Sequence, residues 1–223
     1  MIPLEYFKGW AKVISFRDLQ EALTKLNHIN PELLCPHPSN VFRAFRICLY
    51  DNLKVVFLGQ DPFPQKGIAT GILFGNSRDT PENKISPSLE IIKECCIDYT
   101  IPHGLIEFDN TLENWAEQGV LMLNSALTCK VNEVGSHVMI WRKFIAQLLK
   151  NLSARETGII YVLFGKQAQS FEPYINTKNN HIIKVEHPAY FARVNKSMPN
   201  IFKSIDVLLK EKYGETIKWY TEY

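Results

Sequence analysis

The sequence predicts an α/β fold: a single domain, residues 1–223, with a central four-stranded parallel or mostly parallel sheet flanked by helices on both faces. Four short, partly β-branched apolar runs have the character of buried strands: 54–59, 119–124, 159–165 and 181–186. Helical patterns lie between the runs, and strands that alternate with helices form parallel sheets with covered faces. The length of 223 residues suits one domain, and no long linker or internal repeat divides the chain.

Five segments are expected to form helices, each with its apolar stripe toward the core: 19–26, 42–49, the segment that starts at Ser86-Pro87, 141–149 and 201–209. Ser15-x-x-Asp18 resembles a capping box in front of the first helix. At Ser86-Pro87, serine is the expected N-cap and proline occupies the first helical position.

Composition excludes several classes of protein. Apolar residues make up 46% of the chain and charged residues 22%, which excludes an intrinsically disordered chain. The net charge of +2 excludes a strong electrostatic field over the whole surface. No run approaches about 18 consecutive apolar residues, and the N-terminal segment 1–8 lacks a signal-peptide pattern. We expect a soluble, unexported protein that does not bind membranes and is cytoplasmic, or nuclear in a eukaryotic host.

The five cysteines and six histidines show no spacing typical of a metal site or of a disulfide framework. The cysteines are expected to be reduced and packed as small hydrophobic side chains. Neither a metal nor an organic cofactor is expected.

Polar side chains follow every predicted strand. Gln60 and Asp61 follow the first, Asn124 ends the second, Lys166 follows the third and His187 follows the fourth. Because ligands bind outside the carboxyl ends of parallel strands, these groups predict one polar pocket at a single edge of the sheet.

The residue types in this pocket favour hydrolysis. Asp61 and His187 are each followed by proline, which places them on stiff turns, and no nucleophile elbow or phosphate-binding glycine loop is present. The amides of Gln60 and Asn124 donate and accept hydrogen bonds, as reading the edge of a base requires. Phe74 offers a flat face for a base to stack on, although a core aromatic is the alternative.

Six short motifs then occur in one order over residues 54–210: Gly59-Gln-Asp-Pro-Phe63, Gly71-Ile-Leu-Phe74, Ser86-Pro-Ser-Leu89, Leu121-Met-Leu-Asn124 with Ser136-His137 downstream, Leu163-Phe-Gly165 and His187-Pro188. Each motif alone is weakly specific, whereas the ordered set is strong. The chain resembles the uracil-DNA glycosylase superfamily, and within it the uracil-specific branch most closely.

The resemblance implies roles for five pocket residues. Asp61 would orient the attacking water and stabilise the cationic sugar, and His187 would donate a hydrogen bond to uracil O2. Asn124 would read the uracil edge and reject cytosine, Gln60 would add contacts nearby, and Phe74 would stack on the flipped base.

Two residues directly after Asp61-Pro62 depart from the family pattern. Phe63 stands where the family usually has tyrosine, whose ring excludes the thymine methyl group, and Pro64 replaces a histidine. We expect uracil selectivity to persist because the exclusion is steric. The alternative is a glycosylase of the same fold that acts on another damaged base.

The resemblance also implies which residues contact DNA: Ser86, Pro87, Ser88, Gly165, Lys166, Tyr190, Phe191 and Arg193. A side chain must enter the duplex where the base has left, and Phe191 is the expected wedge by register. The alternative is that Tyr190 and Phe191 merely pack the loop. Arg193, Lys166, Lys196 and Lys203 are expected to form a local basic rim.

The implied partner is uracil-containing DNA, bound by a monomer, with a proteinaceous inhibitor or a replication partner left open. A DNA-binding scaffold of the same fold with reduced turnover is the second alternative. Such a scaffold would be expected to lack Asp61, Asn124 or His187, and all three are present.

Overall fold

A four-stranded sheet forms the centre of the protein in the computed structural model, which describes residues 4–100 and 103–223. Residues 1–3 of the N-terminal segment considered above thus lie outside the described part. The strands are β2 (Val55–Gly59), β4 (Val120–Asn124), β6 (Ile160–Phe164) and β7 (His181–Val185). They run parallel in the order β4-β2-β6-β7, which confirms the predicted sheet and all four of its strands.

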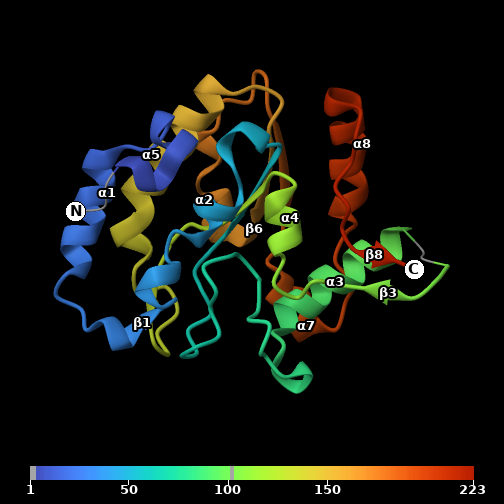
Figure 1. The fold of residues 1–223 in the computed structure, drawn as a ribbon, viewed down its shortest axis with the longest axis horizontal. Helices are drawn as coiled ribbons and strands as arrows, with labels where there is room; N and C mark the ends of the chain where they lie inside the picture. The colour runs from blue at the N-terminus through green and yellow to red at the C-terminus, as the bar shows by residue number, and fades with distance from the viewer. Residues whose placement is uncertain (1–3, 101–102) are drawn as a thin grey trace.

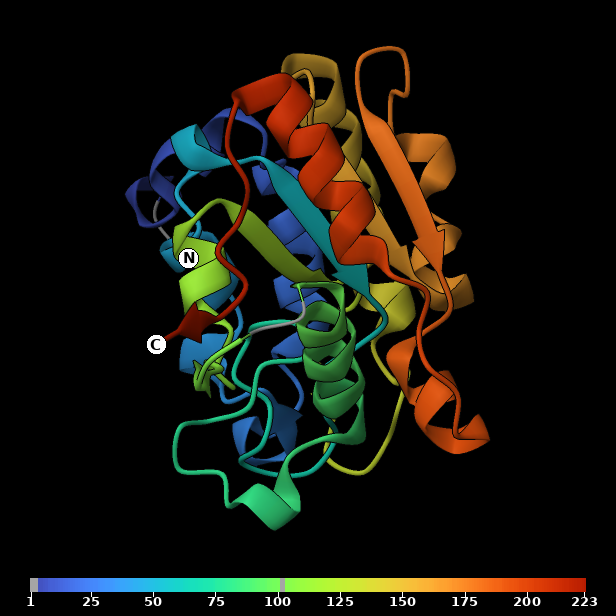
Figure 2. The ribbon, with the colours of Figure 1, turned by 90° about the vertical axis from the view of Figure 1, so that its right-hand side faces the viewer.

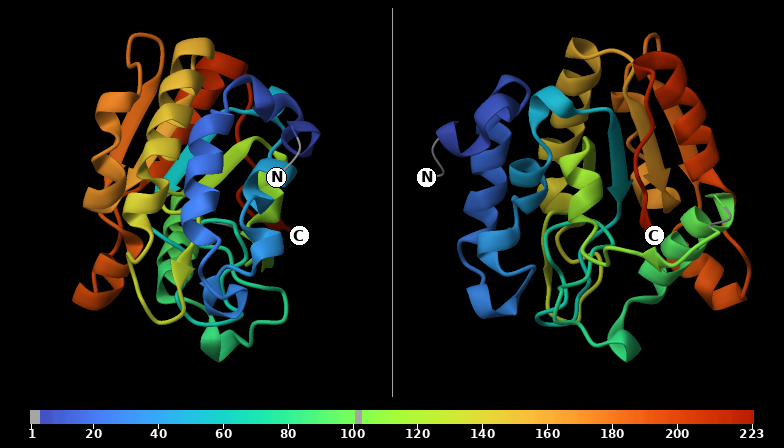
Figure 3. Two further views of the ribbon diagram at one scale, coloured as in Figure 1. Left: turned by 90° about the vertical axis from the view of Figure 1, so that its left-hand side faces the viewer. Right: turned by 45° about the vertical axis from the view of Figure 1, so that its right-hand side comes forward.

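Helices cover both faces of the sheet, as predicted (Figures 1 and 3). The helices α1 (Phe16–Leu26), α2 (Arg43–Ile47) and α5 (Val138–Arg155) pack on one face, and α3 (Pro87–Thr100) and α8 (Ile201–Tyr213) on the other. Successive strand side chains point to opposite faces. In β2, Val56 and Leu58 therefore join the first core cluster, whereas Val55 and Phe57 join the second.

The remaining elements are short. The helices α4 (Glu113–Glu117), α6 (Gly165–Gln169) and α7 (Pro188–Val194) lie in connections, together with two-residue strands and 3₁₀ helices. The short strands are β1 (Leu34–Cys35), β3 (Ile106–Glu107), β5 (Cys129–Lys130) and β8 (Thr221–Glu222). The 3₁₀ helices are Leu4–Lys12, Pro31–Leu33, Pro38–Asn40, Tyr50–Asn52, Glu82–Lys84 and Glu172–Tyr174.

Both predicted helix starts are confirmed. The Ser15 hydroxyl accepts a hydrogen bond from the Asp18 amide at 3.4 Å, and the Ser86 hydroxyl accepts one from the Leu89 amide at 3.2 Å. These bonds satisfy amides that a helix leaves free in its first turn.

Two expectations about burial are wrong. The helix expected over 42–49 ends at Ile47, and Leu49 is 47% exposed instead of facing the core. The fourth strand is only partly buried, because β7 is the edge of the sheet and exposes His181 and Lys184.

The C-terminal tail docks on the domain. β8 pairs antiparallel with β3, and Trp115 Nε1 donates a hydrogen bond to the Trp219 carbonyl at 2.7 Å. All five cysteines are buried thiols, as expected. Over residues 4–100 and 103–223, we find no helix with the length and apolarity that crossing a bilayer requires.

Because the four strands are parallel, their carboxyl ends lie at one edge of the sheet, in the lower part of Figure 2. The connections that leave this edge carry the residues that the sequence singles out. The architecture therefore brings residues that are far apart in the chain to one place.

We expect the turn before β4 to require glycine. Gly119 has a φ of 102°, and a Cβ there would lie 2.0 Å from the Asn52 carbonyl oxygen. Gly119→Ala should lower the free energy of unfolding by about 3 kcal/mol, because a steric clash adds to the cost of a left-handed backbone. Urea unfolding measures this loss.

The matched control is Gly214→Ala at the end of α8. Its φ is 73°, but no atom lies within 4 Å of the added Cβ, so only the backbone cost of about 1 kcal/mol remains. Equal losses in the two variants would contradict the close approach at Gly119.

Candidate active site

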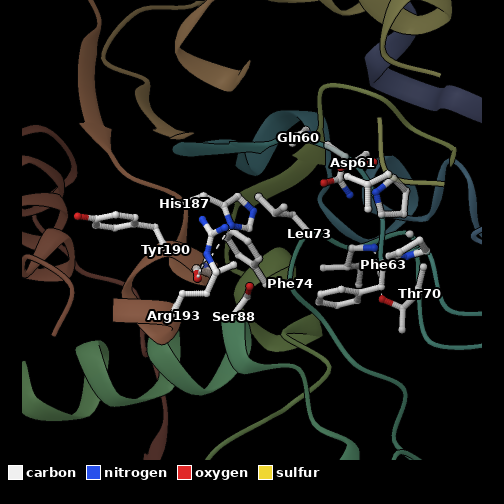
Figure 4. A pocket seen from close by; sticks show the side chains of 18 residues that line it. Gln60, Asp61, Phe63, Thr70, Leu73, Phe74, Ser88, His187, Tyr190 and Arg193 are labelled. Carbon is white, nitrogen blue, oxygen red and sulfur yellow. Dashed lines mark hydrogen bonds between the residues drawn. The ribbon is translucent and has the colours of Figure 1, made fainter. Parts of the chain in front are cut away.

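A cavity of about 490 Å³ opens at the carboxyl edge of the sheet (Figure 4). This volume is typical of sites that bind small ligands. Its walls come from the segment 60–64 after β2, the segment 69–74, Asn124 at the end of β4, and α7 with the preceding His187. Ser88 and Val134 complete the lining.

Asp61 stands at the end of β2 on a turn that the neighbouring connection holds in place. The Gln60 carbonyl accepts hydrogen bonds from the Ala126 amide and the Ser125 hydroxyl, both at 2.9 Å. The Asp61 carboxylate accepts a hydrogen bond from the Gly135 amide at 2.5 Å. Burial raises the pKa of Asp61, and the bond from Gly135 opposes this rise because it favours the charged form.

His187 is the N-cap of α7, and its Nδ1 accepts a hydrogen bond from the Ala189 amide at 3.2 Å. In a neutral imidazole the other nitrogen then carries the proton, so Nε2 is a donor. Burial, with a smaller contribution from the Arg193 charge, lowers the pKa of His187 to about 4. His187 is therefore a neutral hydrogen-bond donor at neutral pH.

Asn124 ends β4 and pairs in register with Gly59 of β2. Its side chain lines the cavity and is 8% exposed. The Oδ1 atom is buried, and no group in the described part of the chain donates a hydrogen bond to it. A buried acceptor without a donor costs about 1–3 kcal/mol, so this atom indicates a place for a ligand that donates.

Aromatic rings form part of the wall. Phe74 lines the cavity and also belongs to the core, with its ring at right angles to those of Phe164 and His187 at centroid distances of 5.0 and 5.6 Å. Phe63 is half-buried and lines both this cavity and an adjoining groove. Figure 4 places Phe63 on the Asp61 side and Phe74 beneath His187.

The adjoining groove has a volume of about 720 Å³, and its lining includes Lys66, Lys84 and Arg193. It continues directly from the cavity, because Phe63, Ser88 and Arg193 line both. Of the four residues expected to form a basic rim, Arg193 lines this groove, and its lining does not include Lys166, Lys196 or Lys203. The two lysines in the groove were not singled out by the sequence, and one of them, Lys66, forms an ion pair with Glu32 at 2.7 Å.

The residues expected to contact DNA divide into two groups. Ser88, Tyr190 and Arg193 line the cavity, while Ser86 is buried and donates a hydrogen bond to Asn76 Oδ1 at 3.2 Å. The remaining loop residues lie outside the cavity lining: Pro87 and Lys166 are exposed, and Gly165 is buried at the start of α6.

The structure places the two aromatic residues of the expected wedge segment differently. The segment is the helix α7, in which neighbouring side chains point about 100° apart. Phe191, the expected wedge, is 8% exposed and packs in the core, whereas Tyr190 is 41% exposed and lines the cavity. Which of the two enters the duplex stays a prediction.

Thr70, Val134 and Gly135 are among the site residues that the sequence did not indicate. Thr70 and Val134 line the cavity, and nothing in their local sequence marks them. Gly135 binds Asp61 through its backbone and has a φ of 77°. Its position directly before Ser136-His137 was the available signal, but a backbone donor has no side-chain signature.

Comparison with known proteins agrees with this geometry. Residues 47–209 match the family model of the Uracil DNA glycosylase superfamily. A uracil-DNA glycosylase of Campylobacter jejuni is 34% identical over 87% of this chain and 83% of its own. One from Fusobacterium nucleatum is 32% identical over 91% and 96%, and one from Alkaliphilus metalliredigens is 40% identical over 70% and 67%.

A solved structure is also similar: a tyrosine-to-phenylalanine variant of mimivirus UNG in complex with UGI. It has a TM-score of 0.79 and 26% identity, covering 98% of this chain and 88% of that one. The family model covers most of the chain, and the relatives align over most of their own length. This chain therefore belongs to the uracil-DNA glycosylase superfamily.

Proposed function

We propose that the protein hydrolyses the N-glycosidic bond of a uracil flipped out of DNA and leaves an abasic site. The observation that carries the proposal is that one cavity is lined by Asp61, by the neutral donor His187 and by Asn124, whose buried Oδ1 has no hydrogen-bond donor in the described part of the chain. The family membership and the uracil-DNA glycosylases among its relatives support it.

Asn124 supplies the recognition step. Its Oδ1 accepts a hydrogen bond from uracil N3–H, and its Nδ2 donates one to O4. Cytosine presents an acceptor at N3 and an amino group at the neighbouring carbon, so both contacts would be lost. Discrimination between bases then follows from a single amide in a fixed orientation.

His187 stabilises the leaving group. As the bond breaks, negative charge collects on uracil O2, and the Nε2–H of a neutral imidazole donates to that oxygen. Removing such a preorganised donor typically costs about 10²–10³ in rate. Since burial keeps the imidazole neutral, no proton has to be released before it acts.

Asp61 acts on the sugar side. Its carboxylate stabilises the positive charge that develops on the sugar and orients the attacking water. Burial raises the pKa of Asp61, and the bond from Gly135 opposes this rise and directs the carboxylate. Because residue 64 is proline and has no polar side chain, Asp61 orients this water without a neighbouring imidazole.

The DNA strand follows the groove next to the cavity. Lys66, Lys84 and Arg193 there suit phosphate contacts, which position the strand without reading its sequence. Tyr190 fills the space that the base leaves in the duplex, which offsets part of the cost of flipping. Asp61, Asn124 and His187 come from the same chain, so the proposed reaction needs no residue of a second copy, and we propose that the protein acts as a monomer.

The activity test uses a DNA strand with one uracil, treated with hot alkali after incubation. Wild type should give a cut strand, and Asp61→Asn and His187→Ala should each lower the rate by at least about 10²-fold. Val207→Ala on the exposed face of α8 is the control. An uncut strand at high wild-type concentration would favour a scaffold, and undiminished rates in both variants would remove these residues from the mechanism.

Substrate range separates uracil from other bases. Because Phe63 keeps the ring of the pocket wall, thymine should be released far more slowly than uracil, by a factor set by steric exclusion of its methyl group. Comparing release of uracil, thymine, hypoxanthine and 5-substituted uracils tests this. Faster release of any other base would favour the alternative glycosylase.

The protonation state of His187 is accessible by NMR. We expect the Nε2–H tautomer and a pKa of about 4 in the folded protein. The pKa of a histidine in the unfolded chain is near 6.5. As the pH falls from 6.5 toward 4, the unfolded state therefore takes up a proton on His187 before the folded state does. Wild type should lose stability relative to His187→Asn over this pH range. Titration near 6.5, or an Nδ1–H tautomer, would contradict the assignment.

Single alanine substitutions of Tyr190 and Phe191 distinguish a side chain that enters the duplex from one that packs in the core. Tyr190→Ala should leave the melting temperature unchanged and lower the excision rate about tenfold on duplex DNA, with a smaller loss on single strands, which need no flipping from a stack. Phe191→Ala should instead destabilise the fold by about 3 kcal/mol. A duplex-specific loss in the Phe191 variant alone would reverse the assignment.

A further inference from the structure

Three buried polar side chains are joined by hydrogen bonds at the start of α5, next in sequence to the segment that binds Asp61. Trp141 Nε1 donates a hydrogen bond to Thr128 Oγ1 at 2.7 Å, and Thr128 Oγ1 lies 2.9 Å from His137 Nδ1. All three side chains are at most 2% exposed. Their buried hydrogen bonds are expensive to break, because each would leave a polar atom without a partner.

An indole nitrogen only donates, so the Thr128 oxygen accepts from Trp141. The bond between Thr128 Oγ1 and His137 Nδ1 takes its donor from the hydroxyl or from the imidazole, according to the His137 tautomer. His137 Nε2 is buried and has no hydrogen-bond partner within residues 4–100 and 103–223. The Thr128 hydroxyl is thus the polar anchor of this imidazole in the described structure.

His137 ends the segment 131–137 that touches the turn of Asp61 at two points. The Asn132 amide donates to the Pro64 carbonyl at 2.9 Å, and the Gly135 amide donates to the Asp61 carboxylate at 2.5 Å. His137 is also the N-cap of α5, so the anchored imidazole fixes the place where the segment joins a rigid helix.

We propose that Thr128 is a positioning residue for Asp61: its hydroxyl anchors His137, and this anchor holds the Gly135 amide on the catalytic carboxylate. Thr128 itself touches neither the substrate cavity nor Asp61. The proposal rests on the proposed function for its kinetic readout, while its structural readout is independent of activity.

Two charged side chains act on His137. Burial lowers the pKa of His137, the Lys130 charge lowers it as well, and the Glu133 charge raises it. The Cys129 thiol donates to the Pro62 carbonyl at 3.5 Å, and its pKa is raised to about 12 by burial and, to a smaller extent, by the Asp61 charge, so the thiol stays neutral at neutral pH. Cys35, which lies beside Cys129, likewise has a raised pKa through burial.

Thr128→Val removes the hydroxyl and keeps the shape of the side chain. With the Gly135 amide displaced, the pKa of Asp61 should rise further, and the acid limb of the kcat/KM profile on uracil DNA should move up by about one pH unit. KM should change less than twofold. In NMR spectra, the Gly135 amide proton should move upfield as its bond to the carboxylate weakens.

Two variants serve as controls. Thr128→Ser retains the hydroxyl and should restore both the acid limb and the Gly135 amide shift. Ser153→Ala removes a buried hydroxyl that accepts from the Asn176 amide at 2.9 Å near the other end of α5, and should lower stability without moving either readout.

An unchanged acid limb and an unchanged Gly135 shift in Thr128→Val would overturn the proposal. So would equal shifts in Ser153→Ala, because they would reflect general loss of stability. If wild type released no uracil, the proposed function would fail, but the Gly135 shift would still test the anchor. If Thr128→Val did not fold, two variants of His137 would replace it. His137→Asn keeps a hydrogen-bond partner for Thr128 and should leave the Gly135 shift unchanged. His137→Leu removes that partner and should move the shift.

Discussion

Two backbone amides set the chemistry of the cavity by holding one side chain each. The Gly135 amide binds the Asp61 carboxylate, and the Ala189 amide binds His187 Nδ1. Burial disfavours charge on both groups, yet the amides act in different ways: one favours the charged carboxylate, and the other fixes the tautomer of a neutral imidazole. An acceptor for developing positive charge and a donor for developing negative charge therefore face the same cavity.

The parallel sheet sets the positions of the side chains that these amides bind. Asp61 and Asn124 lie at adjacent strand ends because β2 and β4 are paired in register up to Gly59 and Asn124. His187 arrives from the other side of β6, two strands away. A register shift in any of these pairs would separate the three side chains, so core packing on both faces of the sheet supports the site as well as the fold.

Much of this arrangement could be predicted from the sequence, because strand ends and proline-stiffened turns have local signatures. The four strands, both helix caps, and the shared edge of Asp61, Asn124 and His187 follow from such signals. Other features have no local signature. The exposure of Leu49 depends on where α2 stops, and the burial of Phe191 depends on α7 being a helix packed on α3. The role of Gly135 is a backbone contact across 74 residues of sequence.

A crystal structure with a duplex that carries a non-cleavable uridine analogue would show directly where the base binds. We expect the uracil in the cavity, with its N3–H bonded to Asn124 Oδ1 and its O2 at about 2.7–3.1 Å from His187 Nε2. The sugar would lie on the Asp61 side, and the flanking phosphates in the groove with Lys66 and Lys84. A base that stays stacked in the duplex, or a uracil bound away from Asn124, would contradict this expectation.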